Sequence, residues 1–373
     1  MDYFMNNRSI KKMCAQFGIT GEYLSFEVMT NGHINSTFRV YFLRDGVVKD
    51  YILQKINRYV FTSPENVMEN IISVTEYIRN KIKTQTGVSA RRYVLHYLLS
   101  KMRKPFFVDQ DGEYWRCCRF IDDSVTFNMT DNLKVIEESG KAFGEFQYYL
   151  TDYPVESLHI VIPHFHNTVN RYALFRAAIE ADKAGRRASV QKEIDGYLAL
   201  EDLATRMYKM QRAGDLPLKV THNDTKCNNV LFDKDDFSHL SVIDLDTVMP
   251  GLIGFDFGDA IRFTANSVDE DESDLSLVSL DMDKFRAFSK GFVSVVGKSL
   301  SENERKTLAL GAVTMTVECG MRFLTDYLDG DLYFRVCYPE HNLVRSRCQL
   351  KLAEDMISRL DEMNDVIEKI ARQ

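Results

Sequence analysis

The hydrophobic pattern of the chain changes near Thr130, and this change limits the folds that the chain can adopt. Before it, segments 23–30, 37–42 and 51–56 are rich in aromatic and β-branched residues, with the turn-forming pairs Asn31-Gly32 and Asp45-Gly46 between them. Such runs around Asn-Gly and Asp-Gly are typical of β-hairpins. After residue 130, most apolar residues recur at helical spacing. We therefore expect a β-rich first part and a largely helical second part.

The expected elements give the chain a bilobal organisation. In the first part, Ser63-Pro64-Glu65 is typical of a helix start, and two further strands are expected at 105–108 and 114–120. This gives an antiparallel sheet of about five strands with one helix inserted after the third. In the second part, helices are expected at 131–149, 168–184, 189–213 and from 281 to the end, with a β-rich island at 218–244. The order resembles the protein-kinase-like fold, an α+β chain with a small N-terminal lobe (1–121) and a larger helical C-terminal lobe (122–373).

Composition excludes several classes of protein. The chain has 373 residues, 47 Lys and Arg against 54 Asp and Glu, and a formal net charge of −7, a balance that argues against a dedicated nucleic-acid binder. Its seven cysteines are odd in number and include no C-x-x-C pair, which argues against a disulfide framework or a thiolate zinc cluster. The N-terminus lacks the apolar stretch of a secretory signal, and the apolar run 308–317 is too short to span a membrane. We expect a cytoplasmic monomer with no membrane or nucleic-acid partner.

The most informative segment is 220–233, which fits H-x-D-x-x-x-x-N through His222, Asp224 and Asn229 between two apolar strands. Phosphoryl transfer to a hydroxyl requires a carboxylate that orients the hydroxyl or accepts its proton, and a nearby oxygen ligand for magnesium. A tight loop can place Asp224 at the acceptor and Asn229 at the metal. The alternative is an Asx-rich turn in which both side chains cap local backbone amides.

A second group of carboxylates follows a predicted strand fifteen residues after Asn229. Asp244, at the strand end, is the candidate for the main magnesium ligand beside Asn229. Asp246 is expected either to bind a second ion or to brace the loop. Asp256-Phe257-Gly258 opens a helical run, so Asp256 is interpreted as a helix cap or as a buttress of the loop.

The N-terminal part offers weaker candidates. Lys55, on the third strand, can hold a fixed ammonium against nucleotide phosphates, with Glu69 as its most plausible helix partner and Glu76 as the second. The alternative is a lysine at a strand edge. The turn 31–37 lies where a loop covering the phosphates would lie, but its single glycine makes it a weak phosphate signal. Its polar residues His33 and Asn35 are candidates to contact the acceptor instead.

With these residues in place, the chain resembles the aminoglycoside phosphotransferase and choline kinase superfamily, and is most similar to the N-acetylhexosamine 1-kinases. The resemblance covers nearly the whole chain, and the segments 221–233 and 242–263 are its most specific parts. The other matching segments are 31–37, 54–57, 68–71, 115–121, 318–334 and 341–343.

The resemblance implies a role for each matching residue. Asp224 would be the catalytic base, Asn229 and Asp244 would bind Mg²⁺, and Lys55 would contact the ATP phosphates. The strand Arg119, Phe120 and Ile121 would form the adenine hinge. The sugar pocket would be lined by His33, Arg322 and Tyr333 together with Asp224. The alternative, which spacing alone favours, is that Tyr333 is a half-buried core aromatic and Arg322 is an ion-pair partner.

These inferences predict an ATP- and Mg²⁺-dependent kinase that phosphorylates the anomeric hydroxyl of N-acetylglucosamine or N-acetylgalactosamine. One alternative is a kinase of the same superfamily with another hydroxyl acceptor, such as an aminoglycoside, choline or another sugar. The other is a non-catalytic nucleotide-binding pseudokinase, which the presence of Lys55, Asp224, Asn229 and Asp244 disfavours.

Overall fold

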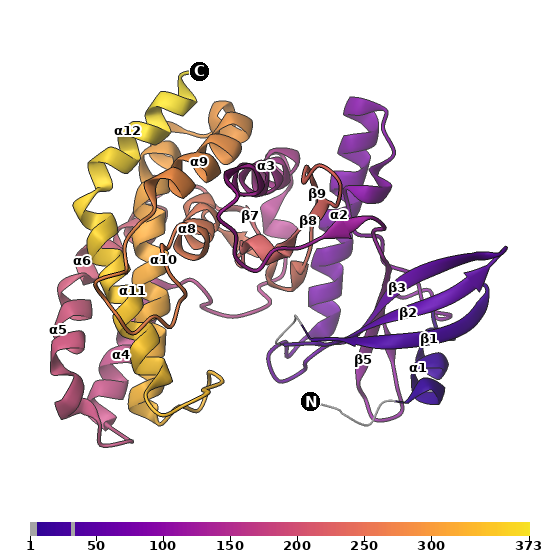
Figure 1. The fold of residues 1–373 in the computed structure, drawn as a ribbon, viewed down its shortest axis with the longest axis horizontal. Helices are drawn as coiled ribbons and strands as arrows, with labels where there is room; N and C mark the ends of the chain where they lie inside the picture. The colour runs from indigo at the N-terminus through magenta and orange to yellow at the C-terminus, as the bar shows by residue number, and fades with distance from the viewer. Residues whose placement is uncertain (1–5, 31–33) are drawn as a thin grey trace.

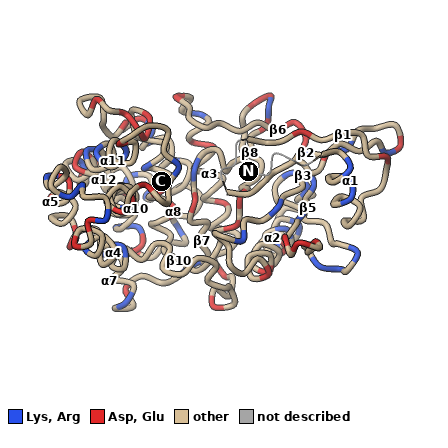
Figure 2. Tube along the Cα trace, turned by 90° about the horizontal axis from the view of Figure 1, so that it is seen from below, with Lys and Arg blue, Asp and Glu red and all other residues tan. Residues whose placement is uncertain are grey.

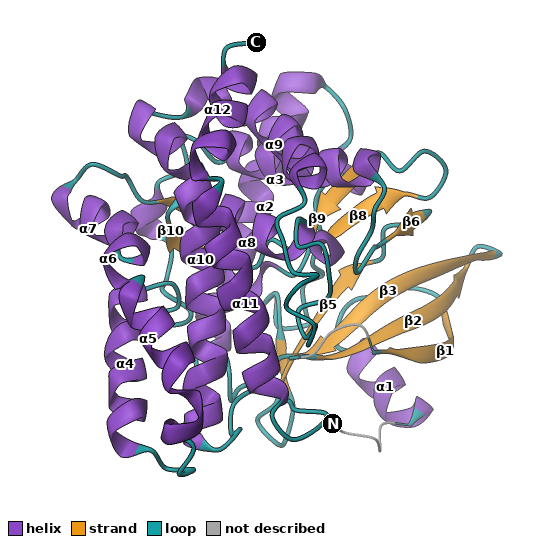
Figure 3. Ribbon diagram, turned by 60° about the vertical axis from the view of Figure 1, so that its left-hand side comes forward, coloured by secondary structure: helices purple, strands orange, loops and turns teal. Residues whose placement is uncertain are grey.

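The computed structural model describes residues 6–30 and 34–373. Figure 1 shows an antiparallel sheet on one side of the molecule and a body of helices on the other, with one long helix between them. The same division into strands and helices is clear in Figure 3. The expected mixed α+β architecture, with an antiparallel first part and a helical second part, is confirmed.

The N-terminal sheet has five strands in the order β1-β2-β3-β5-β4. Its strands are β1 (Glu22–Met29), β2 (Ser36–Arg44), β3 (Val47–Lys55), β4 (Phe107–Val108) and β5 (Tyr114–Arg119). Asp45 and Gly46 both have positive φ values, 52° and 75°, as the predicted hairpin turn between β2 and β3 requires. The helix inserted after β3 is α2 (Pro64–Thr86), which begins at the expected proline. A short helix, α1 (Asn7–Cys14), was not expected.

The two faces of this sheet have different partners. Residues directly opposite one another in antiparallel strands share a face. Phe38, Leu53 and Cys117 are opposite one another and pack in one apolar cluster with α1. The other face carries Gln54 and Arg116, which are opposite each other. This second face is the one turned toward α2 and the helical part.

The second part of the chain is built mainly of helices. These are α3 (Leu133–Tyr149), α4 (Thr168–Ala181), α5 (Gln191–Ala199), α6 (Glu201–Ala204), α7 (Arg206–Ala213), α8 (Ile253–Thr264), α9 (Met282–Val296), α10 (Glu302–Asp329), α11 (His341–Ser358) and α12 (Leu360–Ala371). The β-rich island contains β7 (Lys219–Thr221), β8 (Val230–Asp233) and β9 (His239–Val242), and the short strands β6 (Ser124–Val125) and β10 (Met249–Gly251) pair with β8 and β7.

The single helix expected at 189–213 is wrong, because three short helices take its place. At one break, the Thr205 hydroxyl donates to the carbonyl of Glu201 at 2.7 Å, a side-chain bond that bends helices.

Helices α8 and α10 cross with no side chain between their backbones. A Cβ atom at Gly258 would lie 2.2 Å from the carbonyl oxygen of Gly311, and one at Gly311 would lie 2.0 Å from that of Gly254. Only glycine fits such a crossing. It fixes α8 on α10, the central helix of the largest apolar cluster.

Helix α10 is also the one helix of the described residues that is long and apolar enough to cross a membrane. However, 89% of its apolar window is buried inside the protein, as is typical of a core helix.

A second apolar cluster joins the two parts of the molecule. It contains Ile56 and Met68 of the N-terminal part together with Phe146, Leu240 and Met249 of the helical part. Helix α2 therefore packs against the helical part as well as belonging to the sheet region (Figure 1). In Figure 2, acidic and basic residues are interspersed along both parts.

Candidate active site

The predicted catalytic loop connects β7 to β8, and His222 lies buried at its start. The His222 Nε2 atom lies 2.9 Å from the carbonyl oxygen of Ile243, and Nδ1 accepts the backbone N–H of Asp224 at 3.3 Å. A carbonyl only accepts and an N–H only donates, so the ring carries its proton on Nε2. This histidine holds the loop against the chain that leads to Asp244.

Asp256 buttresses the same loop from the first turn of α8. Its carboxylate accepts the backbone N–H groups of His222 and Asn223, each at 2.8 Å, and the side-chain amide of Gln147 at 2.7 Å. The interpretation of Asp256 as a buttress is confirmed. Asn223 has a φ of 64°, a left-handed conformation that asparagine tolerates better than most residues.

Asp224 lies between two loop side chains that support its ionised form. Lys226 Nζ lies 2.8 Å from Oδ1, and Asn229 Nδ2 donates to Oδ2 at 3.0 Å and to the Asp224 carbonyl at 2.8 Å. Burial acts to raise the pKa of Asp224, but the charge and hydrogen bond of Lys226, with His222 and Asn229, hold that pKa below its usual value. The carboxylate is therefore ionised at neutral pH and available to a proton donor.

Asp244 follows β9 in a left-handed conformation, with φ at 58°. Desolvation, followed by the nearby carboxylates Asp246 and Asp224, raises the pKa of Asp244 to about 7. Negative groups gathered in this way are stabilised by a cation.

The residues at this position fit magnesium. Asn229 uses its Nδ2 for Asp224, which leaves its amide oxygen to coordinate a cation, and its backbone carbonyl accepts the N–H of Ile243, the residue before Asp244, at 2.9 Å. Mg²⁺ prefers such oxygen ligands, commonly one or two carboxylates completed by substrate phosphates. Among the described residues, no group of three or more His, Cys, Asp or Glu side chains could hold a metal ion by itself, so phosphate oxygens would have to complete the set.

Asp246 is held on both of its carboxylate oxygens. Arg116 donates to Oδ1 and, at 3.0 Å, to Oδ2, which also accepts Asn35 Nδ2 at 2.6 Å. The structure thus joins two residues that the sequence analysis placed in different sites, Asn35 and Asp246.

Lys55 ends β3 and lies opposite Ser36 and Trp115 in the sheet. It therefore shares a face with Trp115, whereas Gln54 and Arg116 share the face turned toward Asp246. The expected helix partner, Glu69, lies on the exposed side of α2 and pairs with His159 Nε2 at 2.8 Å. The role of Lys55 at the phosphates stays a prediction.

The predicted hinge residues leave the sheet at the end of β5. The backbone N–H of Arg119 donates to the His96 carbonyl at 3.0 Å, and that of Phe120 donates to the Asp50 carbonyl at 3.1 Å. The carbonyl of Ile121 accepts the Ser124 hydroxyl at 2.7 Å. Arg119 and Phe120 line a cavity of about 370 Å³, and their contact with adenine stays a prediction.

Two of the residues predicted to bind the acceptor, Arg322 of α10 and Tyr333 of the following loop, are brought together. The Arg322 guanidinium lies 5.8 Å from the ring of Tyr333 and 5.3 Å from that of Phe334. The loop is held by the carboxylate of Asp326, which accepts the successive N–H groups of Leu332, Tyr333 and Phe334 at 2.8–2.9 Å. His33, the other predicted pocket residue, lies outside the described residues.

His166 connects this side to the catalytic loop. It bonds the Glu318 carboxylate at 2.9 Å through Nδ1 and the Asn223 carbonyl at 3.2 Å through Nε2. Glu318 lies one helical turn before Arg322 on α10. The predicted acceptor residues and the predicted catalytic loop are thus adjacent.

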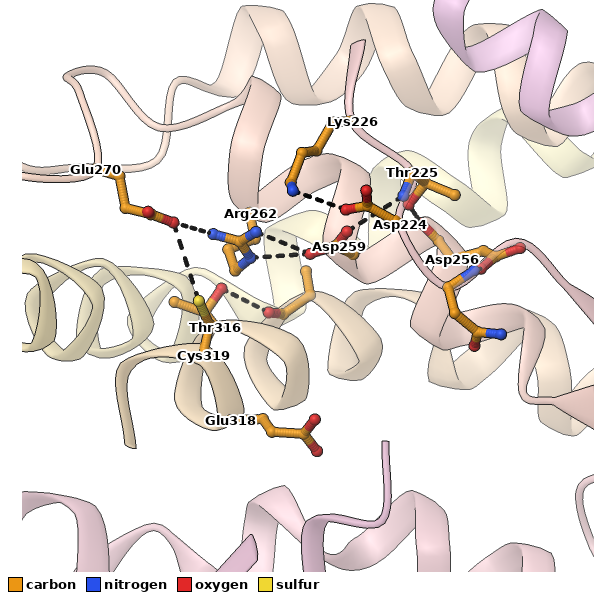
Figure 4. Close-up of polar contacts among 12 residues, drawn as sticks. Asp224, Thr225, Lys226, Asp256, Asp259, Arg262, Glu270, Thr316, Glu318 and Cys319 are labelled. Carbon is orange, nitrogen blue, oxygen red and sulfur yellow. Dashed lines mark hydrogen bonds and ion pairs between the residues drawn. The ribbon is translucent and has the colours of Figure 1, made fainter. Parts of the chain in front are cut away.

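Sequence reasoning missed several residues of the site. Figure 4 shows the Asp224–Lys226 pair and, beside it, a chain of contacts from Thr225 through Asp259 and Arg262 to Glu270. Lys226 could have been noticed two residues after Asp224, on the same loop. Arg116 could have been noticed because a charged residue inside a buried strand requires a partner. The link from Arg262 to Glu270 carries no signal in the sequence.

The comparisons with known proteins agree with this fold. A model described as the phosphotransferase enzyme family matches residues 33–287. Among solved structures, a microcompartment-associated aminopropanol kinase is 14% identical with a TM-score of 0.62, over 96% of this chain and 99% of that one. An aminoglycoside phosphotransferase from Alicyclobacillus acidocaldarius is 10% identical with a TM-score of 0.61, over 96% of each chain. A choline kinase from Cryptosporidium parvum is 13% identical with a TM-score of 0.57, over 99% of this chain and 100% of that one. At such identities the structures establish the kinase-like fold, and the family match covers more than half of the sequence. The chain therefore belongs to the phosphotransferase enzyme family.

Proposed function

We propose that the protein transfers the terminal phosphate of ATP, with Mg²⁺, to the anomeric hydroxyl of N-acetylhexosamines, giving the sugar 1-phosphate. The observation that carries the kinase part of this proposal is the geometry of one loop. Asp224 is held ionised beside Lys226 and Asn229, and it lies close enough to Asp244 for its charge to contribute to the raised pKa of Asp244. ATP would lie between the lobes formed by residues 1–121 and 122–373.

In this mechanism Asp224 orients the acceptor hydroxyl and accepts its proton as the new O–P bond forms. The pKa of Asp224 is lowered, which keeps the carboxylate ionised but makes it a weak base. A hemiacetal hydroxyl is more acidic than an ordinary alcohol and suits such a base. Because the transition state is loose, most of the rate enhancement comes from position and charge neutralisation.

Other residues of this chain would stabilise the phosphoryl group. Lys226, beside Asp224, supplies a positive charge where negative charge develops on the group being transferred. The predicted contact of Lys55 with the phosphates would have to form from the end of β3, because Lys55 lies on the sheet face opposite to that of Arg116. When bound at Asn229 and Asp244, Mg²⁺ would neutralise phosphate charge.

The proposed acceptor class rests on the resemblance at 221–233 and 242–263 and on the charge of the pocket. Arg322 lies over aromatic rings. Burial lowers the pKa of the nearby Arg171, and the positive charge of Arg322 lowers it further. Two guanidinium groups disfavour cationic acceptors such as choline or an aminoglycoside, which require carboxylates or an aromatic cage free of cations. A sugar hydroxyl or acetamide oxygen is a suitable partner for them.

The acceptor is tested by a panel containing N-acetylglucosamine, N-acetylgalactosamine, their non-acetylated parents, choline and kanamycin, with ADP release as the readout. We expect turnover with the N-acetylated sugars, and a phosphorus NMR signal from a phosphate on the anomeric carbon. A product phosphorylated at the sixth carbon would contradict the anomeric assignment and leave the kinase assignment standing. ATP binding without any phosphorylated product across the panel would support the pseudokinase alternative.

A further inference from the structure

A buried ion pair crosses from the N-terminal sheet to the turn that follows Asp244. Arg116 of β5 and Asp246 are 130 residues apart in the sequence, and their side chains are only 2% and 3% exposed. The two guanidinium Nη atoms bond one carboxylate oxygen each, with Nη2 at 3.0 Å from Oδ2. This two-pronged arrangement fixes orientation as well as distance.

On the sheet side, the guanidinium is held by neighbouring strands. Arg116 Nε donates to Gln54 Oε1 at 2.9 Å, and Gln54 in turn donates to the Thr37 hydroxyl at 3.1 Å. The guanidinium carbon of Arg116 also lies 5.7 Å from the centre of the Tyr97 ring. The position of the Arg116 guanidinium is therefore fixed relative to β2, β3 and β5.

On the other side, Asp246 belongs to the short turn Leu245–Thr247, which begins directly after Asp244. Its Oδ2 also accepts Asn35 Nδ2 at 2.6 Å, and Asn35 Oδ1 accepts the backbone N–H of Asn57 at 2.9 Å. Any rotation of the sheet relative to this turn would separate two charges that are out of water, which is unfavourable.

We propose that Arg116 is a positioning residue of the phosphoryl transfer. Through the Arg116–Asp246 clamp it fixes the sheet to the turn that presents Asp244, so that the carboxylate of Asp244 and Asn229 face the nucleotide phosphates together. Asp246 is the anchor of this clamp and not a second metal ligand. The inference rests on the proposed nucleotide site.

The test compares nucleotide binding with and without magnesium, because a loss of packing alone would weaken both equally. In Arg116→Lys and Asp246→Asn, we expect the affinity for Mg·ADP, measured by calorimetry, to fall roughly ten-fold or more. The affinity for ADP in the presence of a chelator should change less than about two-fold, and the half-saturating Mg²⁺ in turnover should rise in parallel. Equal losses with and without Mg²⁺ would overturn the proposal.

A double-mutant cycle separates the clamp from the rival role of Asp246 as a second metal ligand. If the clamp is correct, Arg116→Gln combined with Asp246→Asn weakens Mg·ADP no more than the worse single variant, because both remove one interaction. If Asp246 binds metal, Asp246→Asn alone causes the loss and Arg116→Gln does not, which contradicts the proposal. Arg347→Lys is the control, because Arg347 pairs with Glu193 at 2.5 Å between α11 and α5.

Two further measurements distinguish a failure of the clamp from a failure to fold and from a failure of the proposed function. Thermal unfolding identifies variants that do not fold, and Asn35→Ser then replaces Arg116→Gln as a milder change at the same carboxylate. Small-angle scattering of the ligand-free protein should give a larger radius of gyration for Arg116→Gln than for the wild type and Arg347→Lys. An unchanged radius would contradict the clamp itself. Wild-type protein that binds no Mg·ADP would contradict the proposed function and, with it, the positioning role of Arg116, but not the structural clamp.

Discussion

At the scale of single residues, Asp224 carries the greatest share of the proposed chemistry. Asp224→Asn keeps the size of the side chain but removes its ability to accept a proton, so we expect kcat to fall by roughly 10²- to 10⁴-fold. The KM for ATP should stay within about three-fold of the wild type, because Asn229 and Asp244 remain in place. Steady-state kinetics with the N-acetylated sugar measure both. Near-wild-type turnover in this variant would show that Asp224 is not the base.

The His239–Glu138 pair predicts how stability depends on pH. Burial opposes a charged His239 ring, but hydrogen bonds with Glu138 and Glu145 raise its pKa to about 9, and the hydrogen bond with His239 lowers the pKa of Glu138 to about 2. The stabilisation from the raised histidine pKa is complete below its unfolded pKa of about 6.5 and is lost as the pH rises through about 9. The stabilisation from the lowered Glu138 pKa is present above about 4.5 and is lost as the pH falls toward about 2.

Urea unfolding of the wild type and His239→Gln at about pH 6 and about pH 9 measures this dependence. His239 is 17% exposed, but Glu145 is 41% exposed, so solvent screens part of the interaction between them. Between the two pH values, the free energy of unfolding of the wild type should therefore fall by on the order of 2 kcal/mol more than that of the variant. An equal loss in both proteins would show that the pair does not contribute.

At the scale of elements, the crossing of α8 and α10 determines where the predicted catalytic loop lies, because α8 carries Asp256 and Asp259. In Gly258→Ala the new methyl group would meet the backbone of Gly311, so we expect destabilisation of about 1–3 kcal/mol from overpacking and a fall in kcat. Gly254→Ala is the matched control on the same helix, since its methyl group would meet the flexible end of Met207 at 2.5 Å. Thermal melting and turnover of both variants test this, and equal behaviour of the two would contradict it.

Elements also show what sequence reasoning can and cannot supply. The strands, α2 and the loop from His222 to Asn229 were predictable because their signals are local: turn pairs, a helix-start proline, and chemistry packed into eight residues. One of the breaks in 189–213 lies where the Thr205 hydroxyl donates a hydrogen bond to the carbonyl of Glu201 in the preceding turn. The contact between Arg116 and Asp246 joins segments that are distant in the sequence. The contacts between Asp326 and the loop of Tyr333 depend on the conformation of that loop. A local sequence pattern encodes neither. The assignments of Lys55, Glu69 and the hinge therefore remain predictions.

At the scale of the whole molecule, the apolar cluster that joins α2 to Phe146, Leu240 and Met249 predicts that the two parts unfold together. Calorimetry should give one transition with equal calorimetric and van't Hoff enthalpies. Mg·ATP at about one hundred times its dissociation constant should stabilise the protein by about 2.7 kcal/mol, seen as a higher melting temperature. ATP with a chelator is the control. Two separate transitions would show that the parts are independent.

The crossing of α8 and α10 also has a consequence for how this protein can be altered by successive mutation. At Gly258 and Gly311 the neighbour is main chain, and main chain cannot be trimmed by a second substitution as a side chain can. No single substitution on the opposite helix makes room for a larger residue. A second mutation therefore cannot compensate for a substitution at either glycine. Mutant libraries of this protein should therefore leave these two positions fixed. Positions such as Arg322 and Tyr333, where the contacts are between side chains, can be varied together.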